Sequence, residues 1–397
     1  MLDSSTKQNK VVGGNNKPTK FSNGVKKLIY IANARIPTEK AHGIQIMKMC
    51  EAFAYTGLDV ILILPRRLNK IKDDPFDYYG VRRNFKIIKL PTLDLISFGL
   101  GQFGFFAETL IFLISSAIYL FFRKYDILYT REWPAVLFFR NIVLEIHSLP
   151  AKASFIHKKA WQKTKALFVL TSFIKNELIK LGVSENKILI LPDAVDLEKF
   201  GIKISKEEAR KKLGLPPDKK IILYTGSFYL YNWKGVDVLL EAAKNFGEGF
   251  LFLFVGGSSE EIEQIKSKYN NLSNVLLLGH KLYAEIPCYL KSADVLALPN
   301  KSGHAMSEKH TSPLKLFEYM ASSRPIVASN LPSLREVLTE KEAVFFRPND
   351  STNLAHAIKK ILDDSSLAER LTQSALQKVQ NYTWQNRSHR AIDFIIR

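Results

Sequence analysis

Apolar and polar residues alternate along the chain in a pattern that occurs twice. Lys27–Ala32 (KLIYIA) is a continuous apolar run, and a loop separates it from Gly43–Tyr55. In that second stretch apolar residues recur at the three- and four-residue spacing of a helix. Gly57 and another apolar run, Val60–Leu64, follow directly. The first part of the chain therefore predicts a strand–helix–strand unit.

The same order begins again in the second half of the chain. Lys220–Tyr224 (KIILY) predicts a strand, Gly235–Lys244 a helix, and Leu251–Val255 a further strand. Between the two units lies Ile188–Phe200 (ILILPDAVDLEKF), where a strand gives way to a proline and polar turn residues, and we place the domain junction there. Continuous apolar strands that alternate with helices are typical of parallel sheets covered on both faces. The chain therefore predicts an α/β fold that begins twice.

These patterns divide the chain into four parts. Residues 1–25 are polar and basic, which is typical of a disordered tail. We expect one doubly wound domain over residues 26–192 and a second over residues 193–380. Residues 381–397 are amphipathic, which predicts a helix that crosses back onto the first domain.

Phe103–Phe122 (FGFFAETLIFLISSAIYLFF) is the most apolar stretch of the chain and carries a single charge. Three interpretations stay open: a buried helix of the first domain, a monotopic membrane contact, and a membrane span, for which the length just suffices. The buried helix is the simplest of them. Arg123 and Lys124 follow directly, and Arg66 and Arg67 end an earlier strand. A basic, Phe-rich face suits an anionic membrane surface.

Composition and charge narrow the classes of function. The chain has 397 residues, of which 46% are hydrophobic and 24% charged, as in a globular protein of two or three domains. Its formal net charge of +19 favours anionic partners. The basic residues are scattered, and the sequence has no RNA-binding motif, zinc-finger spacing or basic-region helix, so nucleic acid is not expected as a partner.

Cysteine usage indicates a reducing compartment. Cys50 and Cys288 are the only cysteines, which excludes a disulfide framework or a metal centre built from cysteines. No secretory signal opens the chain. We expect a cytoplasmic protein that binds peripherally to the inner face of the cell membrane.

The stretch TSPLKLFEYMASSRPIVASN, Thr311–Asn330, contains the strongest candidate site. It predicts a helix with Ser312 as N-cap and Pro313 as first residue. The backbone N–H groups of Leu314 and Lys315 then lack intrahelical acceptors. Lys315 stands at the positive end of the helix dipole, where a cation costs about 0.3–1 kcal/mol. Free amides, the dipole and an ammonium together predict a phosphate site.

Glu318 lies one turn further, on the same face as Lys315. It allows two interpretations. One is an intrahelical Lys–Glu pair that contributes about 0.2–0.5 kcal/mol. The other is a carboxylate that accepts hydrogen bonds from sugar hydroxyls beside the phosphate. Leu316, Phe317 and Met320 are expected to bury the opposite side.

This stretch resembles the nucleotide-sugar motif of retaining GT-B glycosyltransferases of family GT4, the glycosyl transferases group 1. Five further segments resemble that family's motifs in the same order and over most of the chain: KLIYIANARIPTEKAHGIQIMKMCEAFAYTG, LEIHSLP, ILPDAVDLEKF, LYTGSFYLYNWKGVDVLLEAA and LLLGHKLYAEIPCYLKSADVLALPN. The resemblance implies a GT-B fold, in which two Rossmann-like domains face a central cleft. The first domain would bind the acceptor and the second the nucleotide sugar.

The resemblance also implies roles for single residues. Glu318 would hold the ribose hydroxyls of the donor, Lys234 would bind the diphosphate, and His147 would contact the transferred sugar. These three are the catalytic candidates; a solvated loop lysine and a strand-end histidine are the plain alternatives for the last two. Further donor-binding candidates are Gly43, Gly226, Ser227, Gly279, His280, Ser312, Pro313, Leu314 and Lys315. Gly43 would let the first-domain loop approach the diphosphate, unless it is a simple turn glycine.

Three positions depart from the family pattern. His310 stands where many members carry the first Glu of Glu-x7-Glu. Ser227 follows Gly226 where an Arg is frequent, which leaves more of the phosphate neutralisation to Lys234. Ser323 ends the helix where glycine is usual, and a left-handed serine there costs about 1 kcal/mol.

The implied activity is transfer of a hexose from a UDP- or GDP-linked sugar to an acceptor hydroxyl with retention, without cofactor or metal, in cell-surface polysaccharide or glycolipid assembly. The acceptor would be a saccharide or a lipid-linked molecule, with an anionic membrane surface as a further partner. A sugar-nucleotide epimerase or phosphorylase of the same fold is one alternative. A non-catalytic basic protein that binds membranes and keeps a relic pocket is the other.

Overall fold

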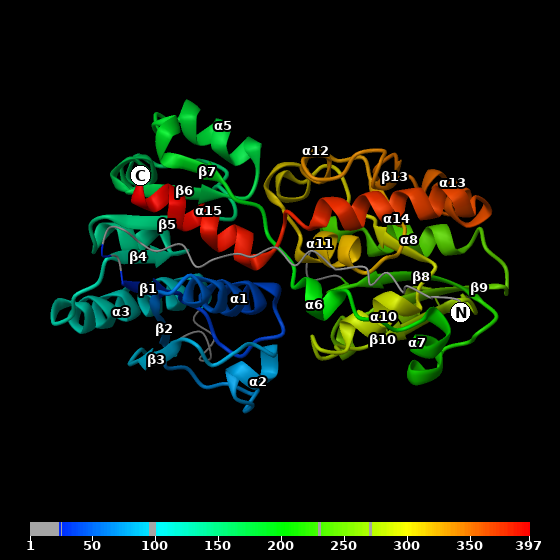
Figure 1. Ribbon diagram of the computed structural model, residues 1–397, viewed down its shortest axis with the longest axis horizontal. Helices are drawn as coiled ribbons and strands as arrows, with labels where there is room; N and C mark the ends of the chain where they lie inside the picture. The colour runs from blue at the N-terminus through cyan, green and yellow to red at the C-terminus, as the bar shows by residue number, and fades with distance from the viewer. Residues whose placement is uncertain (1–23, 25, 95–100, 229–231, 270–271) are drawn as a thin grey trace, which may run out of the picture.

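The computed structural model describes residues 24, 26–94, 101–228, 232–269 and 272–397. The predicted tail, residues 1–25, lies outside them except for Gly24 and so stays a prediction. Two parallel β-sheets, each covered by helices on both faces, lie side by side (Figure 1). The predicted α/β class and the two strand–helix–strand units are confirmed.

The first sheet has seven strands in the order β3-β2-β1-β4-β5-β6-β7. Its strands are β1 (Lys27–Ile31), β2 (Asp59–Pro65), β3 (Lys86–Leu90), β4 (Ile127–Thr130), β5 (Ile142–Ile146), β6 (Ala166–Val169) and β7 (Ile188–Ile190). In β1, Leu28 is paired with Val60 on one side and with Ile127 on the other. The strand order reverses between β1 and β4, and in such sheets ligands bind beyond the carboxyl ends of the strands at that point.

Helices cover both faces of the first sheet, as the continuous apolar strands predict. Side chains alternate along β1: Leu28 and Tyr30 join one core cluster, and Ile29 and Ile31 join the other. The first cluster is covered by α1 (Ala41–Tyr55), α2 (Pro75–Tyr79) and α15 (Trp384–Ile396). The second is covered by α3 (Gly101–Phe121), η1 (Trp133–Leu137), α4 (Phe155–Lys163) and α5 (Ser172–Lys180).

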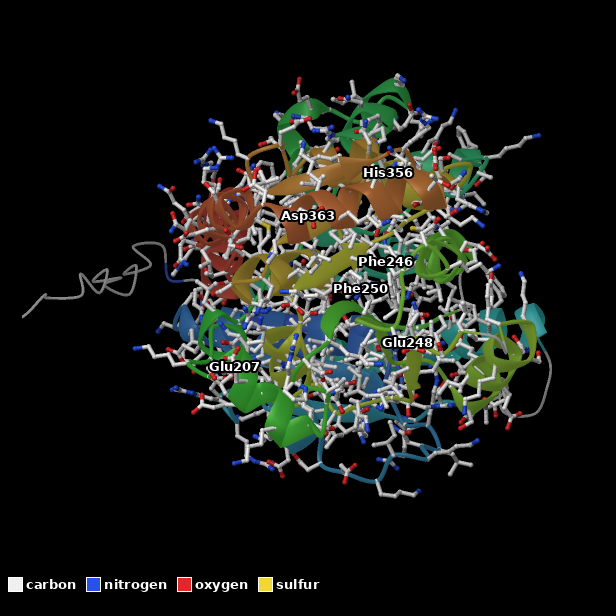
Figure 2. The ribbon with its side chains drawn as sticks, turned by 90° about the vertical axis from the view of Figure 1, so that its right-hand side faces the viewer. Glu207, Phe246, Glu248, Phe250, His356 and Asp363 are labelled. Carbon is white, nitrogen blue, oxygen red and sulfur yellow. The ribbon has the colours of Figure 1, made fainter. Side chains whose placement is uncertain are left out.

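The second sheet has six strands in the order β10-β9-β8-β11-β12-β13. They are β8 (Lys220–Thr225), β9 (Phe250–Val255), β10 (Val275–Leu278), β11 (Val295–Leu298), β12 (Ile326–Ser329) and β13 (Ala343–Phe346). One face packs on α8 (Val236–Ala243) and α13 (Ser351–Asp363), and the other on α10 (Ile286–Ser292) and α11 (Leu314–Ala321). Figure 2 shows Glu207 of α7 (Lys206–Leu213) on the opposite side of this domain from His356 and Asp363 of α13.

Shorter elements and one long helix complete the chain. They are η2 (Glu185–Lys187), α6 (Leu197–Phe200), η3 (Asn232–Lys234), α9 (Ser259–Lys268), η4 (Met306–His310), α12 (Pro332–Arg335) and α14 (Ser365–Val379). The chain crosses from the first domain to the second and later crosses back. The two crossing segments are joined by a hydrogen bond, in which Val195 donates its N–H to the carbonyl of Tyr382 at 2.9 Å. After the second passage α15 packs on α1 of the first domain (Figure 1).

Helix α3 accounts for the most apolar stretch of the sequence. Among the described residues, Gly104–Phe121 is the one helical segment long and apolar enough to cross a membrane, judged by length and composition. Its inner face is packed in the protein: Phe112 and Leu113 are fully buried, and so is Glu108. The predicted buried helix is therefore present, but its outer face is open to solvent.

Candidate active site

The start of α11 differs from its prediction. The helix begins at Leu314, and its N-cap is Pro313 in an extended conformation (φ −74°, ψ 131°) with no capping side chain. The prediction that Ser312 caps the helix was wrong, because its Oγ accepts a hydrogen bond from the N–H of Asp193 at 3.2 Å instead. Within the described part of the chain, the N–H groups of Leu314 and Lys315 have no hydrogen-bond partner. The helix mouth is therefore open, as the sequence predicts.

The ammonium group of Lys315 is buried at this mouth. Its Nζ has no hydrogen-bond partner among the described residues and lies 3.8 Å from the centre of the Tyr224 ring. Burial lowers the pKa of Lys315 well below 10.5, and the nearby Lys234 lowers it further. A Cβ on Gly226, whose φ is 120°, would lie 3.3 Å from this Nζ. In the described part of the chain, this buried amine therefore has no ion-pair contact.

Lys234 brings a second cation to the same place. Its Nζ donates to Ser227 Oγ at 2.5 Å, and burial lowers its pKa to about 8. Gly235, the next residue, is left-handed (φ 71°), and a Cβ there would overlap the carbonyl oxygen of Pro299. Only glycine allows this close approach between the start of α8 and the end of β11. The tight turn therefore holds Lys234 beside Lys315.

Glu318 lies one turn along α11 from Lys315. Its residue is 6% exposed, and burial raises its pKa to about 7 although a hydrogen bond from Tyr283 and the nearby Lys315 and Lys199 oppose the rise. Lys199 donates to the carbonyl of Tyr79 at 3.2 Å, and its Nζ lies 4.3 Å from the centre of the Tyr283 ring. The carboxylate therefore has partners beyond the predicted pair with Lys315.

Other side chains of α11 are buried on all sides of the helix, not only opposite Glu318. Leu314, Leu316, Phe317, Tyr319 and Met320 are each at most 8% exposed. The Tyr319 hydroxyl accepts a hydrogen bond from the N–H of Thr225 at 2.9 Å. This bond fixes α11 against the end of β8, where Gly226 follows.

A further charged pair lies at the domain junction. Asp193 is buried, its Oδ1 lacks a hydrogen-bond partner among the described residues, and burial raises its pKa to about 7. Arg387 of α15 comes within 4.0 Å of it and also donates to Glu145 Oε1 at 2.8 Å and to the carbonyl of Pro192 at 2.8 Å. The junction therefore carries charges that the sequence motifs did not indicate.

His147 lies at the end of β5 on the first domain. Its Nε2 is 2.7 Å from Glu145 Oε1. Burial and the positive charge of Arg131 lower the pKa of His147 to about 4, so the imidazole is neutral at physiological pH. His147 lines a cavity of about 490 Å³, together with Asn33, His42, Arg131, Glu132, Trp133, Leu149, His157 and Trp161.

The structure brings most, but not all, of the predicted donor residues together. Gly226, Ser227, Lys234 and the start of α11 meet at the carboxyl end of β8. Gly43 lies in the first turn of α1, where a Cβ would overlap the Tyr79 hydroxyl, so packing alone requires glycine there. Two further candidates follow another strand of the sheet: Gly279 comes directly after β10, and His280 beside it is exposed.

The three departures from the family pattern have distinct outcomes. Ser323 is left-handed (φ 59°), as predicted. Ser227 is the acceptor for the Lys234 ammonium. His310 ends η4 and is half-buried, and burial lowers its pKa.

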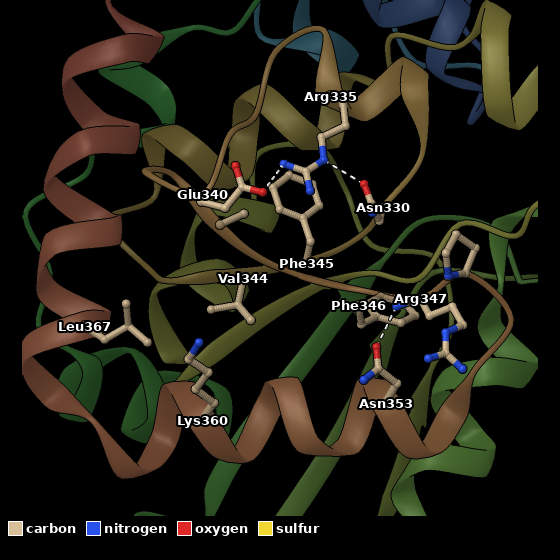
Figure 3. Close-up of a pocket in the computed structure, with 12 residues that line it drawn as sticks. Asn330, Arg335, Glu340, Val344, Phe345, Phe346, Arg347, Asn353, Lys360 and Leu367 are labelled. Carbon is tan, nitrogen blue, oxygen red and sulfur yellow. Dashed lines mark hydrogen bonds and ion pairs between the residues drawn. The ribbon is translucent and has the colours of Figure 1, made fainter.

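A second cavity, of about 480 Å³, lies at the β13 edge of the second sheet (Figure 3). Three of its polar groups are paired: Arg335 donates to Glu340 Oε1 at 2.6 Å and to Asn330 Oδ1 at 2.7 Å. The Arg335 guanidinium lies 3.5 Å from the centre of the Phe345 ring. This cavity offers no unpaired charge comparable to that of Lys315. No group of three His, Cys, Asp or Glu residues is placed to hold a metal in the described ranges.

Comparison with known proteins finds similarity to glycosyltransferases, and one family model matches part of the second half of the chain. Residues 205–378 match the model described as "Glycosyl transferases group 1". The chain is 26% identical over 225 residues to D-inositol 3-phosphate glycosyltransferase 1 of Catenulispora acidiphila, which covers 53% of this chain and 51% of that protein. It is 32% identical over 197 residues to phosphatidyl-myo-inositol mannosyltransferase of Mycobacterium leprae, covering 48% of this chain and 50% of that one. The chain spans about half the length of these curated relatives.

Solved structures resemble the whole chain. Sucrose-phosphate synthase of Thermosynechococcus elongatus has a TM-score of 0.74 at 21% identity, covering 93% of this chain and 98% of that one. Anabaena HepE in complex with UDP and glucose has a TM-score of 0.72 at 14% identity, covering 94% and 99%. These likenesses confirm the predicted GT-B fold.

Proposed function

We propose that this chain, whose residues 205–378 match the glycosyl transferases group 1 model, transfers a sugar from a nucleoside diphosphate sugar to an acceptor hydroxyl with retention of configuration. The buried, unpaired ammonium of Lys315 at an open helix start is the observation that carries the proposal. The relatives are named glycosyltransferases, which favours a transferase over an epimerase or a non-catalytic binding protein.

The diphosphate of the donor binds between Lys315, Lys234 and the first amides of α11. An isolated buried cation is unfavourable, and an anion within hydrogen-bond distance removes that cost. Two lysines whose pKa values are lowered by burial indicate that the protein itself supplies too little negative charge at this site. A diphosphate supplies that charge, and its oxygens match the free N–H groups of Leu314 and Lys315.

The ribose of the donor binds next to Glu318. The carboxylate lies one turn from Lys315, so a nucleotide whose diphosphate contacts Lys315 places its ribose hydroxyls close to Glu318. Tyr283 and Lys199 orient the carboxylate. HepE is named as a complex with UDP, which supports a uridine nucleotide ahead of GDP.

The chemical step is departure of the diphosphate as negative charge grows on its oxygens. Lys234, Lys315 and the helix start are fixed before the reaction, and such preorganised donors stabilise the charge where it develops. None of the residues in the matched motifs is an evident nucleophile, so we propose that the acceptor attacks from the face that the diphosphate leaves. A diphosphate oxygen then takes the acceptor proton. The neutral His147 hydrogen-bonds the transferred sugar from the first domain.

The acceptor binds in the cavity of the first domain that His147 lines. The rings of Trp133 and His157 lie 4.2 Å apart there, and Trp161 lies 5.7 Å from His157. Aromatic faces offer apolar contact to a sugar ring, while Arg131 and Asn33 offer donors to its hydroxyls. A saccharide or lipid-linked acceptor fits this lining, and a relative of Escherichia coli, 28% identical over 62% of this chain, is named for a galactose transfer to a diphosphoundecaprenol-linked sugar.

Calorimetry with UDP and GDP tests the donor site. Lys315→Met should weaken binding of the preferred nucleotide about ten- to a hundredfold, because it removes a charged hydrogen-bond donor. Lys266→Met, an exposed lysine of α9, is the matched control and should leave affinity unchanged. Wild-type protein that binds neither nucleotide more tightly than about 1 mM would refute the proposal.

A further inference from the structure

Helix α3 presents an unpartnered apolar stripe to solvent. Phe106 is 65% exposed, Ile118 62% and Phe121 83%. With a rotation of about 100° per residue, the members of the stripe fall within an arc of about 120° on one side of the helix. The α3 stripe consists of Phe106, Leu110, Ile114, Ile118 and Phe121.

The rest of α3 is anchored to the first domain by polar contacts. Asn33 donates to Thr109 Oγ1 at 2.8 Å, and Ser115 Oγ donates to the carbonyl of Pro91 at 2.8 Å. Arg67 forms an ion pair with the fully buried Glu108. The helix is therefore held against the sheet along its inner face, and a membrane span would have to break these contacts. None of the stripe residues belongs to the buried core cluster beneath α3.

A second apolar patch lies on neighbouring elements of the same sheet face. Phe155 and Ile156 begin α4 and are 69% and 53% exposed. Leu137 ends η1, and Phe138 follows it; both are exposed. Helices α3 and α4 and η1 contribute to one core cluster, so the two apolar surfaces belong to one side of the first domain.

The charges around these surfaces are mainly positive. Residues 101–165 contain nine Lys and Arg side chains but four Asp and Glu; two of these four, Glu108 and Glu145, are buried, and Glu132 is half-buried. The exposed basic residues lie at the end of α3 and around α4: Arg123, Lys124, Arg140, Lys152, Lys159, Lys163 and Lys165. Arg123 lies over the ring of Tyr119 in α3, 4.0 Å from its centre, and Lys159 lies 4.6 Å from the centre of the Phe155 ring.

We propose that the α3 stripe and the patch of Leu137, Phe138, Phe155 and Ile156 form one docking face that binds an anionic lipid bilayer. The α3 helix lies in the plane of the interface with its stripe among the acyl chains, and the basic residues contact the headgroups. Charge decides between occupants: a second copy of this chain, with net charge +19, would bring one basic rim against another. A bilayer with acidic headgroups complements both the apolar centre and the basic rim.

The docking face also positions the acceptor cavity, an inference that rests on the proposed function. Asn33 lines that cavity and bonds directly to Thr109 of α3. Trp133 and His157 line it too, and they belong to η1 and α4, which carry the second patch. Docking therefore brings the cavity to the membrane surface. A sugar joined to a membrane lipid is the acceptor class that this placement suits.

Vesicle co-sedimentation tests the docking face. Full-length protein is mixed with vesicles of phosphatidylcholine alone or of phosphatidylcholine with phosphatidylglycerol. We expect binding at least about tenfold tighter to the anionic vesicles, and a loss of about tenfold or more in the variant Phe106→Gln/Ile118→Gln/Phe121→Gln. The matched control Ile179→Gln/Leu282→Gln replaces exposed apolar residues outside the docking face and should bind like wild type.

Two measurements on the same samples separate the outcomes. UDP calorimetry should give equal affinity for wild type and the triple variant, because the changed residues are exposed and lie outside the donor site. Vesicle binding that the triple variant retains would overturn the docking face. If wild type is a dimer that does not bind vesicles and the triple variant is a monomer, the docking face binds a second copy of the chain and the bilayer proposal is overturned. If no protein binds UDP while wild type binds vesicles, the docking face stands and the donor proposal fails.

Discussion

Binding of a nucleoside diphosphate should be accompanied by uptake of protons by the protein. The pKa values of the buried lysines determine the number of protons taken up per nucleotide. Lys234 has a pKa of about 8, so close to half of its side chains are neutral at pH 8. A bound diphosphate raises this pKa towards the ordinary value of 10.5 or beyond, because a nearby negative charge favours the ammonium form. Lys234 alone should therefore take up about half a proton per nucleotide at pH 8.

Lys315 contributes with the same sign. The pKa of Lys315 is also lowered, and an anion raises it again. The nucleotide itself releases little, because a terminal phosphate with a pKa of about 6 is already ionised at pH 8. The net uptake at pH 8 should exceed the half proton from Lys234.

The free energy linked to this uptake is large enough to measure. A return of the Lys234 pKa from about 8 to 10.5 corresponds to about 3 kcal/mol. Affinity should be insensitive to Lys234 well below pH 8 and should fall about tenfold by pH 9, where most of its side chains in the free protein are neutral.

Titration calorimetry at pH 8 in two buffers with different ionisation enthalpies measures the uptake directly. Proton uptake should fall by about half a proton per nucleotide in the Lys234→Met variant. In the Lys315→Met variant it should fall by the amount that Lys315 contributes. Lys266→Met should retain the wild-type value. Proton release by wild-type protein, or uptake that does not change in either site variant, would refute the assignment of the two buried lysines to the diphosphate.

Two other predictions concern stability, measured as the free energy of unfolding in urea. The pKa of Glu318 in the folded state is about 7, above its ordinary 4.5, so the free energy of unfolding falls as pH rises from 4.5 to 7. Glu318→Gln should therefore stabilise the unliganded protein at pH 8 by up to about 3 kcal/mol, while it weakens nucleotide binding. The control Glu342→Gln should destabilise the protein, because the partners of that carboxyl lower its pKa. Gly43→Ala should lower the free energy of unfolding by about 1–3 kcal/mol, since the added Cβ overlaps the Tyr79 hydroxyl. The control Gly247→Ala, with open space around the added Cβ, should change it by no more than about 0.5 kcal/mol. Equal effects of the two substitutions would contradict the packing role of Gly43.

The sequence predicts those parts of the site that depend on neighbours along the chain. The open helix mouth and the unfavourable charge of Lys315 follow from the order of residues in one turn, and both are present. The N-cap was predicted wrongly, because the bond from Asp193 to Ser312 joins residues 119 positions apart. No local pattern indicates such a bond.

The partners of Glu318 escape prediction for the same reason. Lys199 and Tyr283 reach it from two separate segments, and neither stands at a conspicuous spacing. The fold class, in contrast, follows from apolar runs that local periodicity displays. Helix α3 could be predicted only in part. Its apolar composition predicts burial, but the division into a buried face and an exposed stripe depends on which side of the helix contacts the sheet.

Arg387 couples the two halves of the proposed site. It comes from the last helix, yet its guanidinium contacts Glu145, the partner of His147 on the acceptor side. It also approaches Asp193, whose N–H is bonded to Ser312 beside the start of α11. Burial would raise the pKa of Glu145, but Arg387 and His147 hold it well below its ordinary value, so this carboxylate stays charged. The buried Arg387 therefore links charged groups of both halves of the proposed site, and the return of the chain to the first domain serves the site as well as the packing of α15.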